Sequence, residues 1–331
     1  MKIFKKEEAE DMSVKILGTG SFLPENVVTN DYLSTIMDTS DEWISSRTGI
    51  KARHLSKTES TTEMSVQAAK NALLNAGMQA SELDLIIVGT VTGDEVTPST
   101  ACEVQAAIGA EAAVAFDMNA ACSGFMFAMH TAYAYLQSGI YKNALIIGAE
   151  TLSRIMDWSD RSTCVLFGDG AGAAVLGMGQ GGILGFEQGS DGVRGSVLSC
   201  KARVNNNPLV QNEAVLDYVH MDGQEVYKFA VTTVPASIER VLEKAQTDAG
   251  EIKYFLLHQA NIRIIQSVAK RLHVPMEKFP ISLDHCGNIS AASIPILLDE
   301  VNKKGMLNRG DKIVMSGFGG GLTWGTCVLE W

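Results

Sequence analysis

Short apolar runs alternate along the chain with longer stretches in which apolar residues recur at helical spacing. Strand-like runs occur within residues 80–90, 138–151 and 250–260, and helix-like stretches include "TTEMSVQAAKNALLNAG" and "ANIRIIQSVAKRLHV". Apolar runs of this length are typical of strands that are covered on both faces, and their alternation with helices is typical of α/β proteins. We therefore predict largely parallel sheets that are covered by helices.

The order of strand-like and helix-like segments in the first half of the chain also recurs in the second half. Three pairs of segments resemble each other in the same order, namely residues 80–90 and 250–260, 114–125 and 279–290, and 138–151 and 304–318. The partners are separated by about 165 to 170 residues, which is half of the chain. This regularity predicts two similar halves, which we place at residues 13–185 and 186–331, after a polar extension at residues 1–12.

Ligands bind at the carboxyl ends of strands in such folds, so the ends of the repeated strands are the places to search for a site. They offer Cys122, His258, Asn288 and the glycine loop at residues 317–321. A thiolate nucleophile needs a base or a helix N-terminus, and an amide or a backbone N–H can stabilise an oxyanion. Taken singly, each feature has an ordinary structural explanation, as a core cysteine, a core histidine or a turn. Their occurrence at matching ends of a repeated unit favours a site for nucleophilic catalysis.

Six motifs then resemble one known family. They are "DEWISSRTGI", "ACSGF", "DRSTCVLFGDGAGAAVL", "LLHQANIRII", "HCGNISAASIP" and "GFGGGLTWG". In this order, from about residue 13 to the C-terminus, they closely resemble the β-ketoacyl-acyl carrier protein synthase III enzymes of the thiolase superfamily. The resemblance implies a duplicated, thiolase-like α/β fold with layers αβαβα and two mixed sheets. It also implies a decarboxylating Claisen condensation of an acyl-CoA primer with malonyl-acyl carrier protein, which starts fatty acid synthesis without a cofactor.

The resemblance assigns roles to the residues at the strand ends. It implies that Cys122 carries the acyl group as a thioester, while His258 and Asn288 bind the malonyl thioester carbonyl and promote decarboxylation. The active-site loop that would supply oxyanion donors comprises Phe318, Gly319, Gly320 and Gly321. A thiolase would have a second cysteine near this loop, and an elongating synthase a second histidine in place of Asn288; both departures favour the initiating, CoA-primed class.

Substrate contacts also follow from the resemblance. It carries Trp43 and Arg161 over as a clamp on the adenine of CoA, with Arg47 nearby, because an aromatic face and a guanidinium can both stack on the ring. The residues expected to line the pantetheine tunnel are Met221, Gly223 and Asn261. The surface expected to bind the acidic carrier protein comprises Gln259, Ala260, Asn261, Ile262, Arg263, Lys270 and Arg271.

Thr97 occupies a position where many family members have a phenylalanine that closes the acyl pocket across a dimer interface. Our hypothesis is that the smaller side chain lets this enzyme accept primers longer or bulkier than acetyl.

Composition excludes several other classes of protein. The formal net charge of -11 argues against a general nucleic-acid binder, and no apolar run is long enough to span a membrane. Six scattered cysteines without a C-x-x-C pair fit a reducing cytoplasm and disfavour structural zinc, so we expect no metal. The glycine motifs "GTGSFLP" and "FGDGAGAAVLG" do not complete G-x-G-x-x-G, and no G-K-[ST] motif accompanies them, so a dinucleotide or nucleoside triphosphate site is not expected.

The sequence leaves three alternatives open. The same residues could serve a polyketide starter synthase or another acyl-CoA condensing enzyme, or the chain could be a non-catalytic homologue that binds acyl carrier protein. A cysteine hydrolase is a weaker third possibility.

Overall fold

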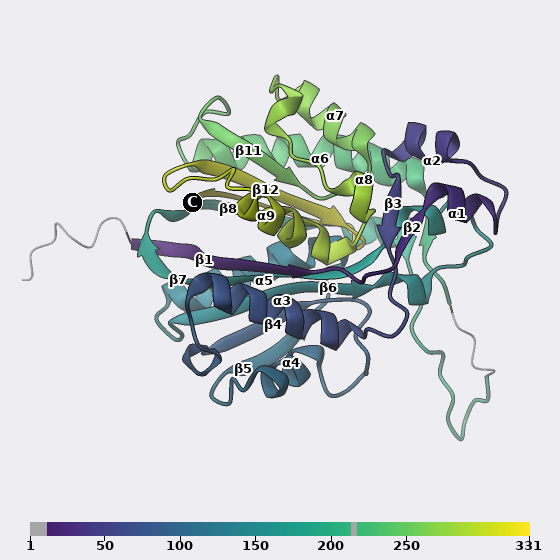
Figure 1. Cartoon of the computed structure of the whole chain (residues 1–331), viewed down its shortest axis with the longest axis horizontal. Coiled ribbons are helices and arrows are strands. Elements are labelled where there is room, and N and C mark those ends of the chain that lie inside the picture. Colours follow the sequence, from purple (N-terminus) through teal and green to yellow (C-terminus); the bar gives the residue numbers. More distant parts are fainter. Residues whose placement is uncertain (1–11, 213–216) are drawn as a thin grey trace, which may run out of the picture.

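The structure is a computed structural model that describes residues 12–212 and 217–331. Two mixed sheets form the centre of the protein (Figure 1). The first sheet contains, in spatial order, β1 (Met12–Phe22), β7 (Asp169–Gln180), β6 (Asn143–Thr151), β4 (Leu85–Gly89) and β5 (Val114–Met118). The second contains β11 (Ile252–Leu257), β12 (Lys312–Gly319), β13 (Thr323–Glu330) and β8 (Gly182–Ser190). Each sheet has parallel strands at one side and antiparallel strands at the other.

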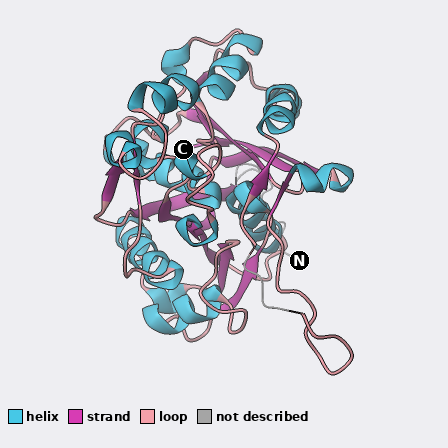
Figure 2. Ribbon diagram, turned by 90° about the vertical axis from the view of Figure 1, so that its right-hand side faces the viewer, coloured by secondary structure: helices cyan, strands magenta, loops and turns pink. Residues whose placement is uncertain are grey.

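Helices cover both outer faces of the sheets and also lie between them (Figure 2). The helices α3 (Thr61–Ala76) and α4 (Thr100–Ile108) cover the first sheet, α5 (Gly124–Gln137) and α9 (Ser293–Lys303) fill the middle, and α6 (Gly223–Lys244) and α7 (Ile262–Arg271) cover the second sheet. This arrangement confirms the predicted layered α/β fold with two mixed sheets. None of the helices in the described ranges combines the length and the apolar character that crossing a membrane requires.

Smaller elements complete the chain. The short helices are α1 (Asn30–Ser34), α2 (Asp41–Thr48) and α8 (Leu283–Cys286), and the two-stranded ribbons pair β2 (Val27–Thr29) with β3 (Ala52–His54) and β9 (Leu198–Ser199) with β10 (His220–Met221). The 3-10 turns are η1 (Ala80–Glu82), η2 (Ala121–Ser123), η3 (Leu152–Ile155), η4 (Cys164–Leu166), η5 (Gly192–Val197), η6 (Met276–Lys278) and η7 (Ser290–Ala292).

Local sequence explains the outer helix α3. Ser60 and Glu63 form a reciprocal capping box at its N-terminus, and Gly77 ends it in the left-handed conformation. Its buried face is rich in alanine, which lets the helix lie very close to β1. A Cβ atom on Gly18 of β1 would stand 2.4 Å from the backbone nitrogen of Ala76, so only glycine permits this packing distance.

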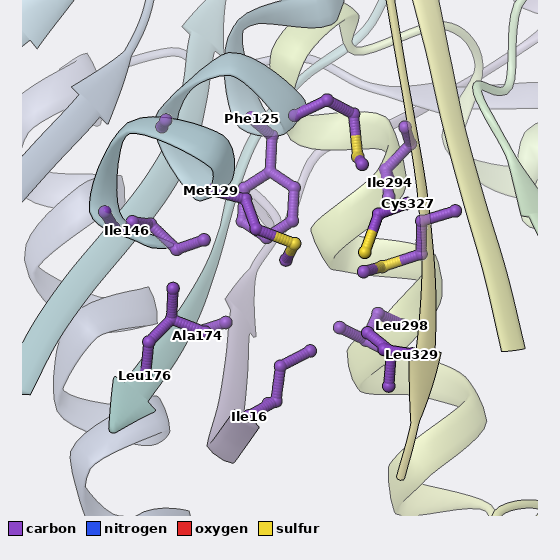
Figure 3. Close-up of a cluster of buried hydrophobic side chains, with 14 of the residues drawn as sticks. Ile16, Phe125, Met129, Ile146, Ala174, Leu176, Ile294, Leu298, Cys327 and Leu329 are labelled. Carbon is purple, nitrogen blue, oxygen red and sulfur yellow. The ribbon is translucent and has the colours of Figure 1, made fainter. Parts of the chain in front are cut away.

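The central helices belong to one core that both halves share. Phe125 and Met129 of α5 are fully buried between Ile146 of the first sheet and Cys327 of the second, with Ile294 of α9 beside them (Figure 3). The first part of α5 is enclosed between the two sheets and needs no polar face, which explains the apolar residues with which the helix begins. The two halves therefore form a single body.

The structure gives the internal repeat a consistent spacing. Leu85 pairs with Ala144 in the first sheet, and Tyr254 pairs with Ile313 in the second, so both partners are displaced by 169 residues. The same displacement relates η2 and α5 to η7 and α9, and the first residues of the two turns, Ala121 and Ser290, have φ angles of 45° and 44°. The duplication thus extends to an unusual backbone conformation.

One predicted repeat is wrong. Residues 279–290 do not contain a strand equivalent to β5, and the second sheet has one strand fewer than the first. The backbone N–H groups of Ser282 and Leu283 donate to the side chain of Gln259 (3.1 Å each) instead of to a neighbouring strand. Proline at position 280 removes another donor from the segment. Asn288 consequently follows a short helix and not a strand end.

The chain passes from the first sheet to the second at Gly181, between β7 and β8. The predicted boundary at residue 185 falls inside β8. The predicted extension at residues 1–12 lies outside the described residues, apart from Met12, with which β1 begins.

Candidate active site

Cys122 follows the end of β5, as the sequence predicts, and lies in the turn η2 close to the N-terminus of α5. The residue is 8% exposed. The Thr323 hydroxyl donates to the carbonyl of Ala120 (3.1 Å) and to the Ser123 hydroxyl (3.2 Å), which ties the turn to β13. Gly319 of β12 lies against the nucleophile, because a Cβ atom there would be 2.7 Å from the nitrogen of Cys122. Strands of the second half therefore position a residue of the first.

His258 and Asn288 reach the same place from the second half. His258 directly follows β11, its backbone N–H donates to the carbonyl of Ser316 (2.9 Å), and its ring packs edge-on against Phe318 with centroids 5.2 Å apart. Asn288 donates its backbone N–H to the carbonyl of Leu166 (2.9 Å). Its side-chain oxygen accepts from the N–H of Ser290 (2.9 Å), which leaves the amide NH₂ as the group that can donate to a ligand.

A narrow pocket of about 120 Å³ joins these side chains. The predicted site residues that line it are Cys122, Met221, Gly223, His258, Ala260, Asn261, Asn288, Phe318 and Gly319. The structure thus brings together the nucleophile, the histidine, the amide and the expected tunnel residues in one cavity.

A wider cavity of about 650 Å³ also reaches Cys122. Its apolar wall includes Val91, Leu152, Ile155, Leu198 and Val219, and Gly320 and Gly321 also line it. The polar residues Lys201, Arg203 and Asp217 lie along another part of its lining. Sequence reasoning missed most of this cavity, because its apolar wall residues Leu152, Ile155, Leu198 and Val219 come from segments that carry no motif.

Burial dominates the electrostatics of the reactive pair. It raises the pKa of the Cys122 thiol to about 12, and the negative charge of Glu150 raises this pKa as well, whereas a hydrogen bond with Ser290 lowers it. Burial also lowers the pKa of His258 to about 3. The pair therefore rests as a neutral thiol and a neutral imidazole. The position of Cys122 at a helix N-terminus favours an ionised thiol, but burial opposes its ionisation.

Glu150 and Ser290 are the neighbours that sequence reasoning missed. Ser290 lines the wider cavity with Cys122, and Glu150 is fully buried in β6. The available signal was an acidic residue at the end of the apolar run "NALIIGAET", because a charged residue is rarely buried without a specific reason.

The predicted adenine clamp is assembled at the surface. The guanidinium carbons of Arg47 and Arg161 lie 4.8 Å and 5.2 Å from the centre of the Trp43 ring, and Arg161 also pairs with Asp38 (3.0 Å). Asn261 donates to the carbonyl of Arg47 (3.1 Å), which links the clamp to the wall of the narrow pocket. A flat ring sandwiched between two groups needs about 7 Å, twice a 3.5 Å contact, so Trp43 and Arg161 have to separate before adenine can enter between them.

The predicted carrier-protein surface is only partly available. Arg263, Lys270 and Arg271 are exposed on α7. Gln259 was wrongly assigned to this surface, because its side chain is completely buried and makes the hydrogen bonds described above. Ala260 lines the narrow pocket, and Ile262 packs against Gly49 at the junction with α2.

Thr97 is exposed and lines neither of the two cavities in the described part of this single chain. An influence of Thr97 on the acyl pocket would require a second copy of the chain.

Comparisons with known proteins agree over nearly the whole chain. Sequence models of 3-oxoacyl-[acyl-carrier-protein (ACP)] synthase III and of its C-terminal part match residues 116–192 and 242–331. The chain is 51% identical over 322 residues to the beta-ketoacyl-[acyl-carrier-protein] synthase III of Clostridium botulinum (strain 657 / Type Ba4), which covers 96% of this chain and 99% of that protein.

Solved structures give the same picture. The 3-oxoacyl-[acyl-carrier-protein] synthase III of Aquifex aeolicus VF5 superposes with a TM-score of 0.90 at 46% identity, covering 96% of this chain and 100% of that one. The priming beta-ketosynthase from the R1128 polyketide biosynthetic pathway also has a TM-score of 0.90, at 34% identity, and the coverage is 97% of both chains.

Proposed function

The chain belongs to the β-ketoacyl-[acyl-carrier-protein] synthase III family, and on this premise we propose how its residues condense an acyl-CoA primer with malonyl-acyl carrier protein. The observation that carries the proposal is the single narrow pocket in which Cys122 of the first half meets His258 and Asn288 of the second. Its residue types match the needs of thioester exchange followed by decarboxylation.

In the first half-reaction, the sulfur of Cys122 attacks the thioester carbon of the primer, and the bond from this carbon to the CoA sulfur breaks. The proton of Cys122 passes to the departing CoA sulfur, with the neutral imidazole of His258 as the nearby group that can accept and return it. Backbone N–H groups of η2 and of the glycine loop, whose Gly319 contacts Cys122, stabilise the transient oxyanion.

In the second half-reaction, the bond between the malonyl α-carbon and its carboxylate breaks and CO₂ leaves. The electron pair remains as an enolate, whose oxygen accepts hydrogen bonds from the Asn288 amide and from the His258 ring. The enolate carbon then attacks the acyl thioester on Cys122, the carbon–sulfur bond breaks, and the released thiolate takes a proton from water. A buried neutral imidazole suits this role, because the step needs hydrogen-bond donors and not a strong base.

Different parts of the substrate would bind in the two cavities. The pantetheine arm would lie in the narrow pocket beside Met221, Gly223 and Asn261, with the adenine at Trp43 and Arg161. The acyl chain would occupy the wider cavity beyond Cys122, whose apolar wall suits hydrocarbon.

The proposal extends to partners and compartment. No cofactor is needed beyond the thioester carriers, because every step above uses side chains and backbone donors of the chain itself. All six cysteines lie in the described residues and are unpaired, which suits a reducing cytoplasm. Val96, the residue before Thr97, is 87% exposed, which supports a homodimer that covers this surface.

Mass spectrometry of the intact protein after exposure to a panel of acyl-CoAs tests the proposal. The wild type is expected to gain one acyl group, Cys122→Ser to gain none, and the exposed-cysteine control Cys102→Ser to behave as the wild type does. Asn288→Ala is expected to form the acyl-enzyme normally but to release CO₂ from malonyl carrier protein about 100-fold more slowly. Equal loss of both half-reactions in Asn288→Ala would refute the division of roles.

A second candidate function is the priming of polyketide synthesis, which the likeness to the R1128 priming ketosynthase supports. The two functions differ in the malonyl donor, so comparing malonyl-CoA with malonyl carrier proteins of fatty acid and polyketide systems separates them. A wild type that never acquires an acyl group on Cys122 would instead favour a non-catalytic carrier-binding protein.

A further inference from the structure

Arg53 of β3 is completely buried and forms no ion pair with a carboxylate in the described part of the chain. Its guanidinium group donates instead to the carbonyl of Val28 (3.1 Å), the side-chain oxygen of Asn30 (2.8 Å) and the carbonyl of Val165 (2.6 Å). The Nε atom is buried without a hydrogen-bond partner among the described residues. Burying a cation in this way is costly, so its position calls for an explanation.

The side chain of Arg53 begins between two loops, residues 165–168 and residues 286–288. A Cβ atom on Gly168 of the first loop would be 3.3 Å from the Cβ atom of Arg53, and a Cβ atom on Gly287 of the second loop would be 3.2 Å from it. These distances are shorter than an ordinary van der Waals contact between carbon atoms. Both loops therefore lie directly against the arginine.

Backbone hydrogen bonds join the first loop to Asn288. The N–H of Asn288 donates to the carbonyl of Leu166 (2.9 Å), and the N–H of Gly168 donates to the carbonyl of Asn288 (3.0 Å). The loop that Arg53 binds through its guanidinium group thus holds both polar backbone groups of Asn288.

Cys122 and His258 are positioned differently, by contacts with β12. The hydrogen bonds of Arg53 within the described residues go to β2, α1 and Val165 and not to β12. A change at Arg53 should therefore displace Asn288 more than it displaces the nucleophile or the histidine.

We propose that Arg53 is a positioning residue that holds the Asn288 amide in place for decarboxylation of the malonyl group. The guanidinium group fixes the loop 165–168 at the carbonyl of Val165, and this loop fixes the backbone of Asn288. A displacement near 1 Å is enough to weaken the hydrogen bond from the amide to the enolate oxygen. The inference rests on the proposed role of Asn288 as a donor to the enolate.

Separate measurement of the two half-reactions tests the proposal. Arg53→Met removes the N–H donors and keeps an unbranched side chain. Release of CO₂ from malonyl carrier protein should slow about 10-fold to 100-fold in this variant, whereas acylation of Cys122 at saturating acyl-CoA should stay within about threefold of the wild type. Arg53→Lys keeps the charge and one donor group, so its rate of CO₂ release should be intermediate. Release of CO₂ at the wild-type rate in a folded Arg53→Met would overturn the proposal.

A double variant distinguishes positioning from a general loss of stability. If Arg53 acts through Asn288, adding Arg53→Met to Asn288→Ala should not slow the release of CO₂ any further. A further fall by the full factor seen for Arg53→Met alone would contradict the proposal. Asp299→Asn is the control for a disturbed buried charge, since Asp299 is 1% exposed, is bonded to Thr19 (2.9 Å) and Lys303 (2.7 Å), and lines neither cavity in the described residues. It should leave the ratio of the two half-reaction rates unchanged.

If Arg53→Met does not fold, Arg53→Lys decides the question. Release of CO₂ that is at least about threefold slower, with normal acylation, would support the proposal, and an equal effect on both half-reactions would overturn it. The Asn288→Ala variant tests the underlying mechanism separately. Slow release of CO₂ in Asn288→Ala but not in the Arg53 variants would leave the proposed condensation intact and remove only the role of Arg53.

Discussion

Gly319 is the residue on which the position of the nucleophile depends. In Gly319→Ala, the new methyl group would stand 2.7 Å from the nitrogen and 2.8 Å from the Cβ of Cys122, so β12 or η2 would have to move. We expect the acylation rate to fall about 100-fold, as a displacement near 1 Å can cause. The free energy of unfolding should fall by about 1–3 kcal/mol, as for other overpacked sites.

Gly192→Ala is the control for this substitution, because nothing lies within 4 Å of the added methyl group. It should leave both the acylation rate and the midpoint of thermal unfolding unchanged. Acylation of Gly319→Ala at the wild-type rate would show that the close contact with β12 does not hold Cys122 in place.

At this scale, the sequence predicts the residues of the site better than their surroundings. Cys122, His258 and Asn288 carry reactive groups in recognisable motifs, and the structure places all three in one pocket. Ser290 and Glu150 could not be assigned, because a serine after a turn and an acid at a strand end have no spacing that distinguishes them. Burial was also invisible in the sequence, although it decides the protonation of Cys122.

At the scale of single elements, α7 joins the predicted carrier-protein surface to the narrow pocket. Asn261 caps the helix by accepting from the N–H of Arg263 (2.8 Å) and, through its donation to Arg47, fixes the helix to α2. The exposed Lys270 and Arg271 lie in its last turn, where positive charge also complements the helix dipole. A carrier protein that docks on these residues would present its arm to a rigid pocket rim.

The double variant Lys270→Glu/Arg271→Glu should therefore bind acyl carrier protein poorly. We expect the KM for malonyl carrier protein to rise about tenfold at low ionic strength, with a smaller effect as salt screens the charges. The rate of acylation by acyl-CoA should not change. Steady-state kinetics with each substrate, at two salt concentrations, separates the two effects.

Lys244→Glu is a matched control because Lys244 lies in the last turn of α6, so the helix-dipole effect is similar. Gly223, at the other end of this 22-residue helix, lines the narrow pocket, which places Lys244 about 32 Å away along the helix axis. An equal rise of KM in Lys244→Glu would indicate a general effect of charge and would remove α7 as the docking element.

At the scale of the whole molecule, the duplication was predictable but its register was not. The apolar strands β4, β6, β11 and β12 stand out because they are buried on both faces, and they reveal the two halves. The segment before Asn288 has a similar polarity to β5, yet Gln259 captures its backbone donors. A competition between a side chain and a strand ladder depends on the tertiary structure, so no local pattern could reveal it.

The choice of primer also depends on the assembly of the whole molecule. Thr97 is exposed and far enough from both cavities to line neither, although Val91 of the same loop lines the wider one. In a homodimer that buries this loop, residue 97 of one copy would approach the acyl cavity of the other. The small threonine side chain should then leave room for primers longer or bulkier than acetyl.

Thr97→Phe is expected to shift this preference toward acetyl. Rates of condensation should be measured with acyl-CoAs of increasing length and branching. The wild type should use the longer primers. With these primers the rate of the variant should fall at least tenfold, since one steric overlap costs about 1–3 kcal/mol, while its activity with acetyl-CoA should remain. Thr58→Phe, another exposed threonine, controls for added aromatic surface and should change nothing. Strict acetyl preference in the wild type, unaltered by Thr97→Phe, would contradict the hypothesis. A monomeric protein in light scattering would also contradict it, because the wider cavity of a single chain does not include residue 97.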